Sequence, residues 1–78
     1  MLINMKEMLA PADKNGFAVP AFNIGSESIL KGVIESAEEK NAPVILAIHP
    51  TELEFLGDSF IKTCIDEAHK SKIPMVIH

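Results

Sequence analysis

The sequence predicts an α/β protein built on a parallel sheet. Three short and nearly continuous apolar runs, 17–24, 43–48 and 74–78, are separated by amphipathic segments. Strands that are apolar on both faces are typical of parallel sheets covered by helices. The segments 27–43 and 58–74 also repeat the same apolar spacing at an offset of 31 residues. This repeat indicates a recurring helix–strand unit.

The first element expected is a short helix over residues 4–14. Asn4 is placed to cap it, and Glu7 follows three residues later, as in a capping box. Pro11 removes one helical hydrogen bond and crowds the preceding turn. We therefore expect the helix to kink or stop near Pro11, ahead of a turn at 15–16.

The apolar run 17–24 is rich in β-branched and aromatic residues and predicts a buried strand. Pro20 should cause a bulge or a missing ladder bond in it. Residues 51–57 are expected as a loop or a short turn. The remaining elements alternate between helix and buried strand: a helix capped by Ser26 at 26–40, a strand at 43–48, a helix at 58–70 and a strand at 74–78.

The chain holds about two and a half of these units. Eight of them would need about 250 residues, the size of a (β/α)8 barrel, whereas a doubly wound sheet would need about four to six. A chain of 78 residues with no Trp and one Cys offsets its ordering entropy with difficulty. We therefore expect residues 1–78 to be the N-terminal part of a single, larger α/β domain.

Composition excludes several function classes. The net charge is −4, and the seven basic residues, all Lys, form no cluster, which argues against a nucleic-acid or anionic-membrane surface. One Cys excludes a disulfide framework. No signal peptide is recognisable at the start of the sequence, and no apolar run approaches the roughly 18 residues of a membrane span. The expected context is soluble, reducing and cytoplasmic.

Polar residues end each of the three apolar runs. Asn23 stands near the end of the first, His49 directly follows the second, and His78 is the last residue of the third. Ligands bind at the carboxyl ends of strands in both parallel architectures, so these residues are the candidate site. Dinucleotide, Walker A, nucleophile-elbow and H-E-x-x-H motifs are absent. Cys64 occupies an apolar helix position and is expected in the core.

Four stretches resemble the start of the class II, zinc-dependent ketose-bisphosphate aldolases, which include the fructose- and tagatose-bisphosphate aldolases. They are N-M-K-E-M-L at 4–9, G-F-A-V-P-A-F-N-I at 16–24, A-E-E at 37–39 and A-P-V-I-L at 42–46. The most specific part is A-V-P-A-F-N.

The resemblance implies a (β/α)8 TIM barrel and an aldehyde-lyase reaction of carbohydrate metabolism, as in glycolysis. That reaction is the reversible cleavage of a ketose bisphosphate to dihydroxyacetone phosphate and an aldehyde. In it, zinc polarises the ketose carbonyl and a carboxylate moves the proton.

The family's residues carry over at three positions. Asn23 matches an Asn that contacts substrate. His49 stands where many members have a substrate-contacting Ser, which leaves the aldehyde-side specificity open. His78 matches the first His of an H-x-D-H motif and would orient the neighbours of the zinc without ligating it.

The catalytic Asp and the zinc-binding His of that motif would follow His78. The resemblance therefore implies no catalytic residue and no zinc ligand within 1–78, and a chain that is inactive alone. The parent protein is expected to be a homodimer or homotetramer that binds a phosphorylated ketose.

Two alternatives stay open. One is a different phosphate-binding barrel enzyme that shares only the architecture; an Asp-His pair just after His78 would favour the aldolase. The other is a non-catalytic, truncated α/β interaction module that pairs its exposed strand edge with a partner. Concentration-dependent association of the chain would support the second.

Overall fold

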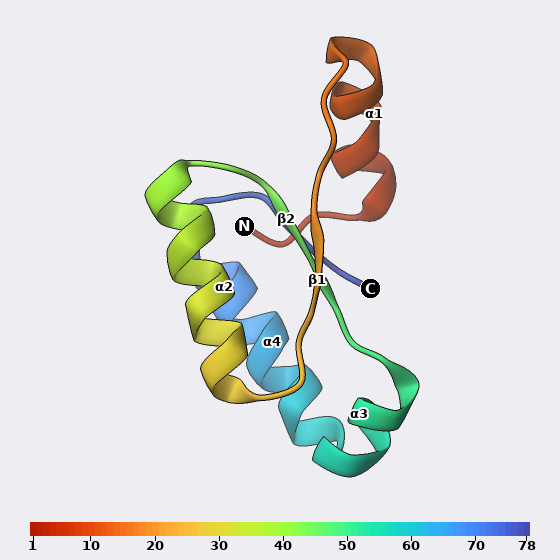
Figure 1. The fold of residues 1–78 in the computed structure, drawn as a ribbon, viewed down its shortest axis with the longest axis vertical. Coiled ribbons are helices and arrows are strands. Elements are labelled where there is room, and N and C mark those ends of the chain that lie inside the picture. Colours follow the sequence, from red (N-terminus) through yellow and green to blue (C-terminus); the bar gives the residue numbers. More distant parts are fainter.

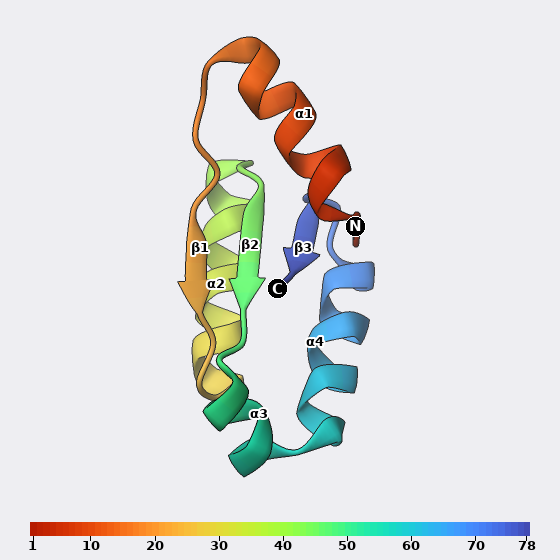
Figure 2. The same cartoon turned by 90° about the vertical axis from the view of Figure 1, so that its right-hand side faces the viewer.

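Three short parallel strands form the sheet. The computed structural model describes residues 1–78, and the strands lie in chain order, β1-β2-β3, all pointing the same way (Figure 2). Their bounds are Ala21–Asn23 for β1, Val44–Ala47 for β2 and Met75–Ile77 for β3. The predicted α/β class with a parallel sheet is confirmed.

Helices pack on both faces of the sheet, and one further short helix lies beyond its carboxyl edge. The long helices α2 (Glu27–Lys40) and α4 (Asp58–Lys70) run side by side over one face (Figure 1). The N-terminal helix α1 (Met5–Asn15) packs toward the opposite face. A short helix, α3 (Pro50–Leu56), lies beyond the carboxyl end of β2 (Figure 2).

The central strand β2 is buried on both faces. Val44 and Leu46 belong to the main core with α2 and α4, whereas Ile45 packs with Met8 of α1 and Val76 of β3 on the opposite face. Because side chains alternate along a strand, a strand covered on both faces needs an unbroken apolar run. The run at 43–48 was predicted as a buried strand on this ground, and the structure confirms it.

Helix α1 begins as predicted but does not stop at Pro11. The Asn4 side chain accepts a hydrogen bond from the Glu7 N–H at 2.8 Å, and the helix continues to Asn15 before Gly16 ends it with a left-handed φ of 69°. Met8 and Ala12 are both buried. Packing on either side of Pro11 holds the helix in place, which outweighs one missing hydrogen bond.

The first strand is shorter and more exposed than predicted. Regular structure covers only Ala21–Asn23, and Phe22 is 48% exposed. The carbonyl of Pro20 accepts from the Ile45 N–H at 2.9 Å, but Pro20 has no N–H to extend the ladder further. β1 is an edge strand, so no neighbour covers its outer side.

The prediction of a loop or short turn at 51–57 was wrong. Residues 50–56 form α3, with Pro50 at its start and the His49 side chain as its N-cap. Pro at the first helical position is favourable because its missing N–H has no partner there in any case. Helical hydrogen bonding then ends at Gly57, whose φ is 79°.

The two long helices bury different stripes of the repeated apolar pattern. α2 buries Leu30 and Ile34 but leaves Ile29 45% exposed, whereas α4 buries Phe60, the repeat partner of Ile29, and Cys64. The buried stripes contribute to the core that the helices share. The exposed stripe of α2 lines a groove of about 550 Å³ beside β1. A second hollow of about 570 Å³, beside β3, includes Ile65 of α4.

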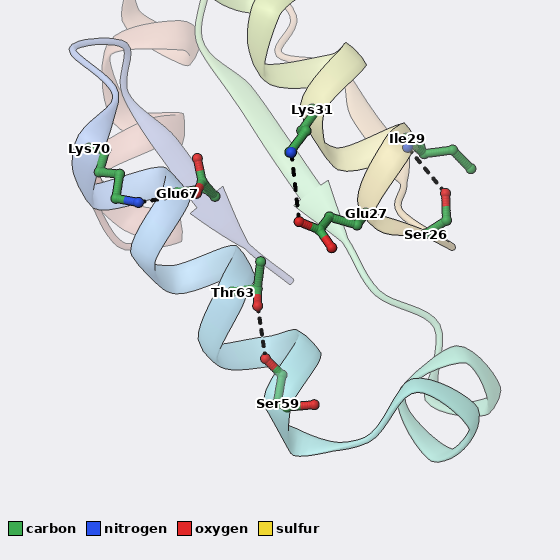
Figure 3. A network of polar contacts seen from close by, with 8 residues as sticks. All are labelled: Ser26, Glu27, Ile29, Lys31, Ser59, Thr63, Glu67 and Lys70. Carbon is green, nitrogen blue, oxygen red and sulfur yellow. Dashed lines mark hydrogen bonds and ion pairs between the residues drawn. The ribbon is translucent and has the colours of Figure 1, made fainter.

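Polar pairs lie on the solvent side of the same helices (Figure 3). Lys31 pairs with Glu27, four residues earlier, at 3.8 Å, and Lys70 pairs with Glu67 at 3.3 Å. Exposed pairs of this kind contribute little to stability, typically below about 1 kcal/mol. None of the helices is both long enough and apolar enough to cross a bilayer.

Candidate functional site

Asn23 and His78 lie on one cross-strand row at the carboxyl edge of the sheet. Asn23 pairs with Ala47 in the register of β1 and β2. His78 brackets the same Ala47 from the other side: its N–H donates to the Leu46 carbonyl at 2.9 Å, and its carbonyl accepts from the Ile48 N–H at 2.7 Å. Two polar residues that are far apart in the sequence therefore flank one small residue.

This row faces away from α2 and α4. Ile45 and Val76 pack on the α1 side of the sheet, and Ala47 and His78 come two residues later in the same strands. Side chains two residues apart share a face, and Asn23 shares it through its pairing with Ala47. Both Asn23 and His78 are exposed, so their polar groups are available at this edge.

His49 is held at the start of α3. It lies two residues beyond Ala47, and its Nδ1 accepts a hydrogen bond from the Thr51 N–H at 3.1 Å. The same Nδ1 lies 2.7 Å from Thr51 Oγ1. Histidine is an unusual N-cap, since Ser, Thr, Asp and Asn lead at that position. The capping role engages one ring nitrogen and leaves Nε2 without a hydrogen bond in the chain.

Glu52 lies in the segment that was predicted to be a loop or a short turn, and the structure brings it to the same edge. Its side chain is half-buried, and its carboxylate would lie 3.6 Å from a Cβ added at Gly25. Gly25 lies two residues after the end of β1 and directly precedes Ser26, the N-cap of α2. A carboxylate near a helix N-terminus is electrostatically favourable. Only recognition of α3 in the sequence would have indicated this contact.

The candidate site, made of Asn23, His49, His78 and Glu52, offers hydrogen-bonding groups and one carboxylate, but not a metal centre. An amide, two imidazoles and Glu52 gather near the carboxyl ends of the strands, yet nowhere in the chain do three His, Cys, Asp or Glu side chains come close enough to hold an ion. Cys64 is fully buried in the core, as predicted. Burial raises the pKa of its thiol above the ordinary 9.0, so Cys64 is a core residue rather than a nucleophile.

A parallel α/β unit with polar groups at the strand ends is a common enzyme architecture, and comparison with known proteins specifies the family. The model of the class-II fructose-bisphosphate aldolases matches residues 3–78. The match covers nearly the whole chain, and the chain belongs to this family.

Individual relatives agree with the family match. A fructose-bisphosphate aldolase of Staphylococcus aureus (strain Mu50) is 45% identical over 81 residues, which cover 99% of this chain and 28% of the relative. Fructose-bisphosphate aldolases of Thermus caldophilus and of a Cupriavidus necator plasmid are each 30% identical, over 26% and 23% of their lengths. The chain thus spans about a quarter of the relatives it matches.

Proposed function

We propose that the protein carrying this chain is a class II aldolase. The reaction is the reversible, zinc-dependent cleavage of a ketose bisphosphate to dihydroxyacetone phosphate and an aldehyde. The family match over residues 3–78 is the observation that carries this proposal. The substrate is a phosphorylated ketose, in keeping with the names of the relatives.

Three residues of this chain contribute to the site in the proposal. Asn23 and His49 contact the substrate through hydrogen bonds, and His78 orients groups around the reacting centre. Their common location at the carboxyl edge supports these roles, because parallel α/β enzymes bind ligands there. Ala47, between Asn23 and His78, leaves space on this face for a substrate group.

Zinc and the proton-transferring carboxylate come from other parts of the protein in this proposal. The residues of the chain do not fit a zinc site, since no three ligating side chains converge. We assign the metal ligands and the acid/base to positions beyond His78. The 78 residues alone are accordingly expected to be inactive.

The proposed architecture is a (β/α)8 barrel in which residues 1–78 form the N-terminal part of one domain. Apolar side chains at both outer edges support this proposal. Ile29 and Phe22 line the groove beside β1, and Ile65 and Ile77 line the hollow beside β3. Further helix–strand units would bury both sets. A cytoplasmic homodimer or homotetramer is proposed for the whole protein.

The test uses the protein as its gene encodes it. Purified protein is assayed for cleavage of fructose 1,6-bisphosphate and tagatose 1,6-bisphosphate, with coupled detection of dihydroxyacetone phosphate. Activity should disappear with a chelator and return with Zn²⁺. Activity that survives complete metal removal, or the absence of cleavage for every ketose bisphosphate offered, would contradict the proposal. Size-exclusion chromatography with light scattering gives the oligomeric state.

A further inference from the structure

Two atoms of Thr51 meet the same nitrogen of His49. The Thr51 N–H donates to Nδ1 at 3.1 Å, and Thr51 Oγ1 lies 2.7 Å from that nitrogen. A backbone N–H can only donate, so Nδ1 must carry a lone pair rather than a proton. The hydroxyl then donates as well, because an unprotonated Nδ1 offers it no hydrogen.

The other nitrogen of the ring follows from this. A neutral imidazole carries one proton, and with Nδ1 as the acceptor that proton sits on Nε2. Nε2 makes no hydrogen bond within the chain, and the His49 residue is exposed. The ring therefore presents a single donor, and no acceptor, to its surroundings.

We propose that Thr51 is a positioning residue that holds His49 as the Nε2–H tautomer, so that His49 recognises an oxygen acceptor of the substrate. This inference rests on the proposed function, because it takes His49 as a substrate contact. It goes further by naming the donor atom and the residue that sets it. The ligand group must be an acceptor, such as a phosphate, carbonyl or hydroxyl oxygen.

The position of α3 makes the arrangement specific to this edge of the sheet. His49 caps α3, and the first turn of the helix places the Glu52 carboxylate beside Gly25, just beyond the end of β1. The ring is thus tied to its own helix through Nδ1, and the helix lies against the neighbouring strand end. A serine at position 49 would also cap a helix, and its hydroxyl would still offer a ligand both a donor and an acceptor, whereas the Nε2–H of His49 offers a donor only.

The first experiment measures the tautomer without any activity assay. The protein as encoded is labelled with ¹⁵N-histidine, and the ring nitrogens are observed by long-range ¹H–¹⁵N NMR above pH 7. His49 is assigned by its disappearance in His49→Asn. We expect a protonated Nε2 and an unprotonated Nδ1 in the native protein and in Thr51→Ser. Thr51→Val, which keeps the backbone N–H but loses the hydroxyl, should show a detectable share of the other tautomer.

The second experiment separates binding from turnover. Loss of one hydrogen bond to the ring should raise KM of Thr51→Val for its ketose bisphosphate about fivefold, with kcat nearly unchanged. Thr51→Ser should restore the native KM. His49→Asn keeps an oxygen that can cap α3, so the free energy of unfolding should stay near the native value. The variant lacks the Nε2–H donor of the imidazole, so its KM should rise.

The outcomes are distinguishable from those of the aldolase proposal. A protonated Nδ1 in the native protein, or a ring tautomer in Thr51→Val and Thr51→Ala that is the same as in the native protein, overturns the inference even if the enzyme is active. A fixed Nε2–H tautomer in a protein without aldolase activity overturns the proposed function and leaves the role of Thr51 supported. If Thr51→Val does not fold, Thr51→Ala and Thr51→Ser provide the comparison.

Discussion

Asn23 and His78 flank Ala47 on a single row of the parallel sheet. Adjacent strands are about 4.8 Å apart, so the two Cα atoms stand roughly 10 Å from each other. Both residues are exposed on the face opposite α2 and α4. The hydrogen-bond register of β2 therefore brings together an amide from β1 and an imidazole that follows β3, with the small side chain of Ala47 between them.

Enlarging Ala47 should block the space between Asn23 and His78. We expect Ala47→Val to raise KM for the ketose bisphosphate about tenfold, because two extra methyl groups occupy the substrate side of the row. Steady-state kinetics of the protein as encoded gives the value. Ala21→Val is the matched control. Ala21 lies on the same face of the sheet, one cross-strand row earlier, where it pairs with Ile45. Equal effects of both substitutions would argue against a substrate site at this row.

Removing the Asn23 amide should affect activity and not stability. Asn23 is exposed at the end of an edge strand, so Asn23→Ala should change the free energy of unfolding by less than about 0.5 kcal/mol. The kcat/KM should fall by about tenfold or more, the value of one lost hydrogen bond to a charged group. Asn15→Ala, at the far end of α1, is the control and should leave kcat/KM at the native value.

A buried hydroxyl joins α2 to the end of α4. Ser71 is 6% exposed, donates to Glu38 Oε1 at 2.8 Å and accepts from the Ile73 N–H at 3.2 Å. Ser71→Ala leaves a buried N–H without a partner and should cost about 1–3 kcal/mol in urea unfolding. Thr63→Ala removes an exposed hydroxyl on α4 that bonds the Ser59 carbonyl, and it should cost much less. If Ser71→Ala left the free energy of unfolding unchanged, that result would contradict this account of the contact between α2 and α4.

The buried thiol should make stability fall in alkali. Burial raises the pKa of Cys64 above the ordinary 9.0. Above pH 9 the unfolded chain loses a proton that the folded chain keeps, so the free energy of unfolding decreases as pH rises. The slope between pH 8.5 and 10 is measured by urea unfolding of the native protein and Cys64→Ala.

Cys64→Ala lacks the thiol, so its stability should decline less over that range. If the free energy of unfolding fell equally steeply with pH in the native protein and in Cys64→Ala, groups other than the Cys64 thiol would account for the pH dependence. The same burial predicts that a thiol reagent labels Cys64 only under denaturing conditions, whereas rapid labelling of the folded protein would contradict the core position.

Local signals in the sequence predicted the elements whose ends are set by nearby residues. Asn4 and Ser26 cap their helices through backbone N–H groups three residues ahead, and the apolar run at 43–48 became the buried central strand. Predictions were wrong where distant packing decides. Contacts of Met8 and Ala12 carry α1 past Pro11, and the edge position of β1 leaves Phe22 exposed.

The candidate site divides in the same way. The sequence by itself determined that Asn23, His49 and His78 end apolar runs, because a polar residue after a buried strand is visible in one dimension. The cap that His49 forms with Thr51 is a local contact, and it went unpredicted because residues 51–57 were expected to be a loop or a short turn. Only the tertiary structure decided that Asn23 and His78 flank Ala47 and that Glu52 reaches Gly25. These two relationships depend on strand register and on the direction in which α3 leaves β2. Both are set by hydrogen bonds and packing between segments that are distant in the chain.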